Sequence, residues 1–218
     1  MLKKTTLLIL LSIIATIIHL YLHDSPLTQS LYFSGENLAR GYFWTPVTSI
    51  FIHASMVHLV GNMLFLYVFG RTLEKEVGSA RMLLAFFLGG ILSFITSLYF
   101  YGHKIIMVGA SAAIFTLIAI VMLIKPLKFS LLFLMPLGLV AILYFIYNVL
   151  AALFLGLETN VGYIPHLIGF IIGIPFGIAW SRGRWKRNLL ITLALLILYL
   201  IISGLLFALI QSLIFQKY

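Results

Sequence analysis

Apolar segments separated by short charged connections follow one another along most of the chain. Seven segments contain no Asp, Glu, Lys or Arg, and most approach or exceed the roughly 20 residues that a helix needs to cross a bilayer. The segments cover residues 5–22, 55–70, 82–101, 105–124, 129–153, 160–181 and 189–215. This pattern predicts an all-α membrane protein with seven spanning helices, the second of them short.

The composition supports this prediction and excludes several classes of protein. Hydrophobic residues make up 63% of the 218 residues and charged residues 9%, whereas a soluble domain carries about 25% charged residues. The absence of cysteine excludes disulfides, thiolate metal sites and cysteine nucleophiles. The net charge of +9 would suggest nucleic-acid binding in a soluble protein, so its position along the chain needs an explanation.

The distribution of this charge predicts how the helices are oriented. A cytoplasmic N-terminus puts eleven of the fourteen Lys and Arg residues on the cytoplasmic side, as the positive-inside rule requires. The acids divide between the sides, with Glu74 and Glu76 inside and Asp24, Glu36 and Glu158 outside. We therefore expect an uncleaved first helix, a C-terminus outside, and no nucleic-acid partner. The lack of a transit peptide or further domains favours a prokaryotic plasma membrane.

Polar side chains interrupt three of the predicted spans. His58 and Asn62 share one face of the second span because they are four residues apart, Ser111 lies in the fourth, and His166 lies in the sixth. These spans run in the same direction, so a rise of 1.5 Å per residue puts His58, Ser111 and His166 within roughly the outer third of the membrane. Polar groups are costly there and usually mark function.

These residue types suit nucleophilic catalysis. A serine hydroxyl needs a neighbouring base, and histidine is the usual base near neutral pH, so Ser111 and His166 are a candidate pair. Asn62, His58 and the Ser111 backbone N–H are candidate donors to an oxyanion. Because no acid lies at this depth, the sequence predicts a Ser–His dyad rather than a triad.

Small residues surround the candidate pair and would let two helices approach closely. Gly162, Gly169 and Gly173 lie on the His166 face of the sixth span, and Gly109 precedes Ser111 in a run of glycine and alanine. We expect these residues to bring the serine and histidine within hydrogen-bond distance.

Together these motifs resemble the rhomboid family of intramembrane serine proteases over about residues 5–181. The resemblance rests on His58-x-x-x-Asn62, Gly109-Ala110-Ser111, Gly162-x-x-x-His166-x-x-Gly169, the segment from Gly70 to Glu74, and His53 five residues before His58. It implies a six-helix catalytic core over residues 1–181, with an outer loop at about 23–54 half sunk in the outer leaflet. A cytoplasmic basic linker and a seventh helix, expected to pack on the core, follow at 182–218.

The resemblance also implies the roles of the site residues. Ser111 would be the nucleophile and His166 the general base, with His58 and Asn62 stabilising the oxyanion. Phe115 would stack on the histidine, and His53 would face the cavity. The implied activity is a serine-type endopeptidase that cuts single-span membrane proteins near the outer face of the lipid bilayer, with substrate entry beside the fifth helix. It requires neither a metal nor a cofactor.

Two other functions remain open at this stage. Ala112 and Thr45 stand where the family usually has glycine and arginine, so a pseudoprotease that binds membrane helices without cutting them is one alternative. A small transporter is the other, because intramembrane histidine and asparagine also form proton or solute paths. Neither a His-Glu-x-x-His zinc motif nor an aspartate within a span occurs in the sequence. The oligomeric state is left open.

Overall fold

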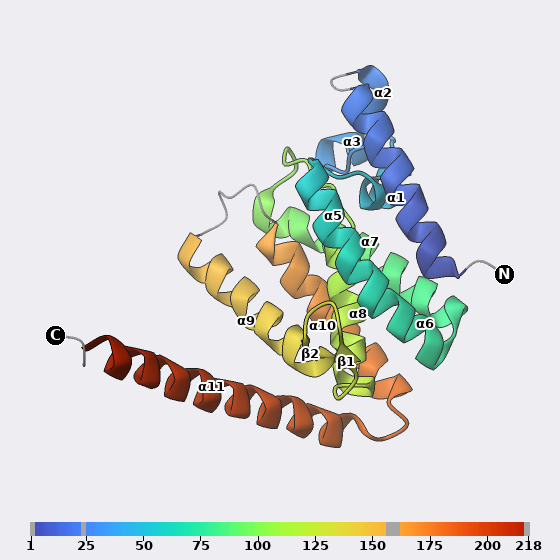
Figure 1. The fold of residues 1–218 in the computed structure, drawn as a ribbon. Coiled ribbons are helices and arrows are strands. Elements are labelled where there is room, and N and C mark those ends of the chain that lie inside the picture. Colours follow the sequence, from blue (N-terminus) through green and yellow to red (C-terminus); the bar gives the residue numbers. More distant parts are fainter. Residues whose placement is uncertain (1–2, 23–24, 156–161, 216–218) are drawn as a thin grey trace.

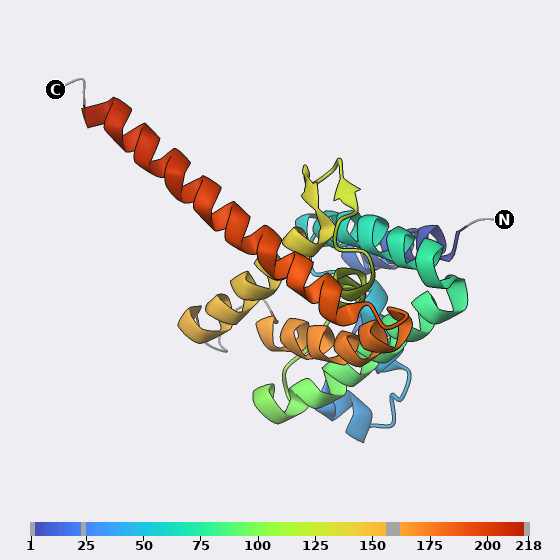
Figure 2. The same cartoon turned by 90° about the horizontal axis from the view of Figure 1, so that it is seen from below.

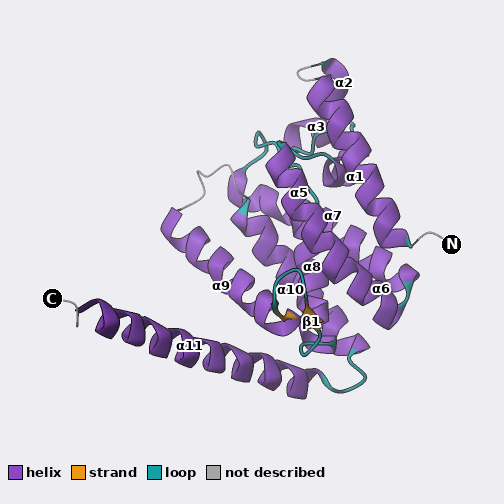
Figure 3. Ribbon diagram, in the orientation of Figure 1, coloured by secondary structure: helices purple, strands orange, loops and turns teal. Residues whose placement is uncertain are grey.

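The computed structural model describes residues 3–22, 25–155 and 162–215, and most of them are helical (Figures 1 and 3). Six helices of the described residues are long and apolar enough to cross a membrane, and one further apolar helix is shorter. Each of the seven predicted segments overlaps one of these helices, so the prediction of a helical membrane bundle is confirmed. Asp24, Glu158 and the start of the predicted sixth span at residue 160 lie outside the described residues.

The main helices follow one another in chain order. They are α1 (Lys4–Tyr21), α5 (Met56–Phe65), a π-helical turn η2 (Leu66–Gly70) that joins α5 to α6 (Arg71–Val77), α7 (Ser79–Tyr101), α8 (Ser111–Ile124), α9 (Leu137–Leu155), α10 (Tyr163–Trp180) and α11 (Trp185–Phe215).

Two helices begin later than the apolar pattern predicts. Helix α8 begins at Ser111 rather than at residue 105, because Met107 pairs in extended conformation with Phe33 and Gly109 has a positive φ of 114°. Helix α9 begins at Leu137 rather than at residue 129. A short hairpin of β1 (Phe129–Ser130) and β2 (Met135–Pro136) precedes it, and Pro136 lacks the backbone N–H that a longer helix would use.

Helix α8 forms the centre of the bundle (Figure 1). Residues 112–123 are all buried, and α7, α9, α10 and α11 pack against this helix. Thr116 shows how close the packing is. Its hydroxyl donates to the Gly169 carbonyl of α10 at 2.8 Å. A Cβ added to Gly89 of α7 would lie 2.1 Å from the Thr116 hydroxyl oxygen. Small residues on α7 and α10 therefore let both helices pack closely on α8.

The connection between α1 and α5 is folded rather than open over its described part. It contains α2 (Pro26–Gln29), α3 (Gly35–Ala39), α4 (Thr45–Thr48) and the 3₁₀ turn η1 (Ser49–Phe51). Ser25 and Ser34 cap α2 and α3 through their hydroxyls, as serine commonly does at helix N-termini. The Ser49 hydroxyl accepts the Phe33 N–H and donates to the Leu31 carbonyl. These two bonds join the middle of the connection to η1 at its end.

At the other end of the bundle, Glu74 caps the N-terminus of α1. Its carboxylate accepts the backbone N–H of Lys4 at 2.8 Å and the hydroxyl of Thr5 at 2.7 Å, and Ser79 donates to the same carboxylate at 2.7 Å. A negative charge at a helix N-terminus satisfies free N–H groups and interacts favourably with the helix dipole. One buried acid thus joins α1, α6 and the start of α7.

Helix α11 joins the bundle only at its start. The Asn188 amide donates to the last carbonyls of α8, at 2.7 Å from Leu123 O and 3.1 Å from Ile124 O, and Thr192 is also buried. The rest of the helix runs out past α9 with its side chains exposed (Figures 1 and 2). The expectation that this helix packs on the core therefore holds for its first turns and is wrong for the remainder, because α8 and α9 offer no surface that far out.

Candidate active site

Ser111 is the first residue of α8, and the preceding turn fixes its position. Gly109 adopts a positive φ that other residues rarely adopt, and its N–H donates to the Ser49 carbonyl at 2.8 Å. The next N–H, of Ala110, donates to Nε2 of His53 at 3.4 Å. The turn is thus held from η1 and from the chain before α5, and Ser111 is left partly exposed.

His53 supports this turn instead of facing an open cavity. The side chain is fully buried, with Nδ1 3.1 Å from the Thr16 hydroxyl, which itself donates to the Phe51 carbonyl. Nδ1 must therefore carry the proton, and Nε2 accepts from Ala110. Burial and the neighbouring His58 lower the pKa of His53 to about 3, so the ring is neutral at physiological pH.

His58 from α5 lies beside the same turn, and Asn62 is bonded to it one turn further along the helix. A Cβ on Gly109 would lie 2.8 Å from Cε1 of His58, so the His58 ring packs on the glycine backbone. The ring also meets His53 edge to face, with centroids 5.0 Å apart. Asn62 is buried, and its amide nitrogen donates to the His58 carbonyl one turn earlier at 3.0 Å, which leaves a second amide hydrogen for another acceptor.

His166 lies over the face of α8 that begins with Ser111. Its ring stacks on Phe115, with centroids 4.6 Å apart and planes 6° apart. Phe115 is four residues after Ser111, so both side chains share one face of the helix. The stacking on Phe115 fixes the plane of the imidazole against this face of α8.

Backbone contact holds α8 and α10 close together on the side that carries these residues. A Cβ on Gly169 would lie 2.2 Å from the Ala112 carbonyl oxygen, and one on Gly173 would lie 2.4 Å from the Thr116 carbonyl oxygen. The atoms nearest Gly169 are the carbonyl O, C and Cα of Ala112, so the alanine methyl does not set this distance. Gly162 was expected to take part in this close approach, but the structure gives it another position. It is the N-cap of α10, and Pro165 of its own turn supplies the described atoms within 4 Å of a Cβ there.

The Gly169→Ala variant tests this contact. A methyl group 2.2 Å from a backbone oxygen forces α10 away from α8, so we expect about 1–3 kcal/mol of destabilisation, measured by thermal unfolding in detergent. Gly61→Ala is the matched control, because nothing lies within 4 Å of a Cβ at that helical position. Equal melting temperatures for the two variants would contradict the close packing of α8 and α10.

Asn148 of α9 is a site residue that the motifs did not reveal. Its Oδ1 lies 2.7 Å from Nδ1 of His166, and its Nδ2 donates to the Tyr144 carbonyl at 2.8 Å. The second bond fixes the amide orientation, because the opposite one would place two acceptors together. Nδ1 of His166 therefore donates to Asn148, and Nε2 carries the free lone pair. The sequence feature that could have revealed Asn148 is its position as a single amide within an otherwise apolar span.

The first turn of α8 also supplies free donors. No side chain caps this helix, and its first intrahelical bond runs from the Ile114 N–H to the Ala110 carbonyl. The N–H groups of Ser111, Ala112 and Ala113 precede that bond, so they are among the donors that a helix N-terminus leaves unpaired. The helix dipole adds partial positive charge at this end. Among the described residues, no group of three His, Asp or Glu side chains is arranged to hold a metal.

The fold and this site define an integral, multi-pass membrane protein whose polar centre lies among packed helices. A family model described as the Rhomboid domain matches residues 40–183, which include every site residue named above. The chain therefore belongs to the rhomboid family.

Several relatives show the same affiliation. The chain is 32% identical to the rhomboid protease GluP of Bacillus subtilis (strain 168) over 167 residues, which are 74% of this chain and 32% of that protein. It is 38% identical to the chloroplastic rhomboid-like protein 11 of Arabidopsis thaliana over 36% of this chain and 28% of that protein. It is 32% identical to the mitochondrial RHOMBOID-like protein 6 of the same plant over 62% and 42% of the two chains. The matches thus cover less than half of each relative.

Proposed function

We propose that this chain is an intramembrane serine endopeptidase that hydrolyses peptide bonds in or near the transmembrane segments of single-span membrane proteins. The observation that carries the proposal is the His166 ring, stacked on Phe115 over the start of α8 and bonded through Nδ1 to Asn148. The bond to Asn148 leaves Nε2 with a free lone pair, and Phe115 shares a helix face with Ser111, which supports His166 as the base for this serine.

In the proposed mechanism, Nε2 of His166 removes the Ser111 hydroxyl proton while Oγ attacks the scissile carbonyl carbon. The same nitrogen then returns this proton to the leaving amine as the C–N bond breaks, and an acyl-enzyme remains. A water molecule, activated by His166 in turn, releases the acyl fragment and restores Ser111. Asn148 accepts the Nδ1–H throughout and so holds the ring in the productive tautomer, the task that a carboxylate performs in a catalytic triad.

The negative oxygen of the tetrahedral intermediate needs donors that are already in place. The unpaired N–H groups of the first turn of α8 are one source, and the helix dipole strengthens them. His58 lies against Gly109, and Asn62 keeps one amide hydrogen beyond its bond to the His58 carbonyl. These donors come from α5 and α8, the two elements that meet at the serine.

The proposed topology puts this chemistry near the outer face of a prokaryotic plasma membrane. With a cytoplasmic N-terminus, α5, α8 and α10 all descend from the outer side, and their first turns carry His58, Ser111 and His166. We assign residues 1–181 to the catalytic core and 182–218 to a basic linker and a seventh membrane helix. A peptide bond reaches Ser111 only after the substrate helix unwinds near its outer end, because a helical carbonyl is occupied by its own hydrogen bond.

A fluorophosphonate probe separates this function from helix binding without cleavage. The probe reacts with an activated serine hydroxyl, so we expect one covalent adduct on Ser111 of the purified chain in detergent, located by peptide mass spectrometry. A chain that stays unlabelled while cleaving no single-span protein in proteoliposomes would instead be a pseudoprotease. Solute flux that survives in a Ser111→Ala variant would favour the transporter.

A further inference from the structure

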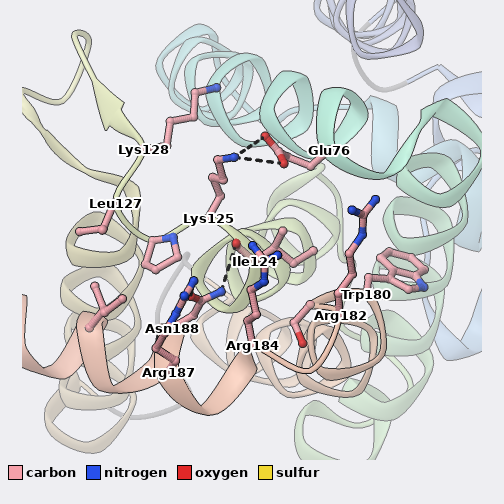
Figure 4. Close-up of a pocket in the computed structure, with 13 residues that line it drawn as sticks. Glu76, Ile124, Lys125, Leu127, Lys128, Trp180, Arg182, Arg184, Arg187 and Asn188 are labelled. Atoms are coloured by element: carbon pink, nitrogen blue, oxygen red, sulfur yellow. Dashed lines mark hydrogen bonds and ion pairs between the residues drawn. The ribbon is translucent and has the colours of Figure 1, made fainter.

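A basic pocket lies at the end of the bundle away from Ser111. Its volume is about 450 Å³, and it opens between the chain that follows α8, the end of α10 and the start of α11 (Figure 4). Five cationic side chains line it: Lys125, Lys128, Arg182, Arg184 and Arg187. The term basic pocket refers to this cavity with its five cationic side chains.

The charge of the basic pocket is largely uncompensated. Glu76 is the one acid among the described lining residues, and it lies 3.3 Å from the Lys125 amino group. Lys128 instead donates to the Thr72 hydroxyl at 2.7 Å. Burial, together with the neighbouring Lys75 and Lys125, lowers the pKa of Lys128 although Glu76 partly opposes this. Positive charge is thus crowded here beyond what the protein itself neutralises, which favours binding of an anion.

The basic pocket lies at the level where the apolar helices end. Helix α8 ends at Ile124, α10 ends at Trp180 and α11 begins at Trp185, and tryptophan is typical of the membrane–water interface. Trp180 is itself a lining residue (Figure 4). The anion that this charge attracts is therefore one found at a membrane surface.

The first part of α11 adds an apolar surface beside the pocket. Asn188 fixes this helix to the carbonyls that end α8, so Arg187 lies on an anchored helix and Arg184 directly before it. Leu190 and Ile197 on the same helix are 66% and 58% exposed. A soluble anion cannot cover such an apolar surface, whereas the acyl chains of a lipid can pack against it.

We propose that the basic pocket binds the phosphate of an anionic phospholipid whose acyl chains lie along the exposed side of α11. Arginine suits this task because its planar guanidinium donates two parallel hydrogen bonds to a phosphate. The bound lipid would join α8, α10 and α11 at the membrane surface. This inference does not depend on the proposed protease activity.

Native mass spectrometry of the purified full chain tests the proposal without any variant. Dioleoyl-phosphatidylglycerol and dioleoyl-phosphatidylcholine share acyl chains and differ in net charge, and we expect the first to bind about 10-fold more tightly or better. Equal binding of the two lipids would overturn the proposal. Retention of inorganic phosphate at millimolar concentration without lipid would overturn the choice of a lipid as occupant.

A pair of double variants locates the lipid. Arg184→Gln with Arg187→Gln removes two cations from the basic pocket, and at about 1 kcal/mol per cation we expect phosphatidylglycerol binding to weaken about 30-fold. Arg40→Gln with Lys104→Gln removes the same charge elsewhere and is expected to leave binding unchanged. Equal losses in both variants would mean that net charge, not this pocket, attracts the lipid.

Discussion

Ser111→Ala and His166→Ala are each expected to reduce cleavage of a single-span substrate in proteoliposomes by at least about 10³-fold. The first change removes the only atom that forms the acyl bond. The second removes the base without which a serine hydroxyl stays a weak nucleophile. Because both residues act in one step, the double variant should be no slower than either single one. Fragment yield on gels and kcat/KM from a fluorogenic substrate measure the effect.

Two control variants separate this result from general damage to the bundle. Ser93→Ala changes another buried serine, in α7, whose hydroxyl has no partner among the described residues. His103→Ala changes an exposed histidine on the connection after α7. Both are expected to cleave like the unaltered chain. A Ser111→Ala variant as active as these controls would show that another group forms the covalent bond.

Asn148→Ala is expected to lower kcat by about 10- to 100-fold with KM nearly unchanged. Asn148 touches the base rather than the substrate, so its loss affects the orientation of the His166 ring and the position of its proton. That loss appears in the chemical step and not in binding. Single-turnover cleavage in proteoliposomes measures it directly.

The conservative variant Asn148→Asp distinguishes positioning from packing. A carboxylate still accepts the Nδ1–H, so most of the rate should return. Its negative charge stabilises the protonated imidazole, and the acidic limb of the pH–rate profile should therefore move to higher pH. Asn188→Ala, which removes another buried amide between helices, should lower thermal stability and leave the profile unchanged. An Asn148→Asp profile identical to that of the unaltered chain would leave Asn148 with a packing role only.

Much of this architecture follows from the sequence because each membrane-spanning helix requires a long run of apolar residues. The runs predicted every main helix except α6, whose charged residues lie outside them. The charges between the runs predicted one common depth for His58, Ser111 and His166. The hairpin at residues 129–136 was missed because short apolar runs have the same composition in a strand and in a buried helix. The late start of α8 was missed because Met107 pairs with Phe33, a residue distant in the sequence.

The orienting partner of His166 is a different kind of omission. The sequence has no acid at this depth, and the prediction of a dyad without a third member followed from that. The structure instead has a neutral amide at 2.7 Å. Whether Asn148 faces α10 or lipid depends on the rotation of α9 about its own axis, which packing decides and composition does not. An amide also avoids the large cost of burying an unpaired carboxylate among apolar helices.

The enclosure of α8 has a consequence for how the protein fits membranes of different thickness. Its 14 residues span about 21 Å, well short of the roughly 30 Å hydrocarbon core. A lipid-facing helix that short would thin the surrounding bilayer. Because residues 112–123 touch protein on all sides, the longer outer helices adapt to the lipid instead. The depth of Ser111 below the outer ends of the surrounding helices is therefore set by the protein and does not depend on the thickness of the bilayer.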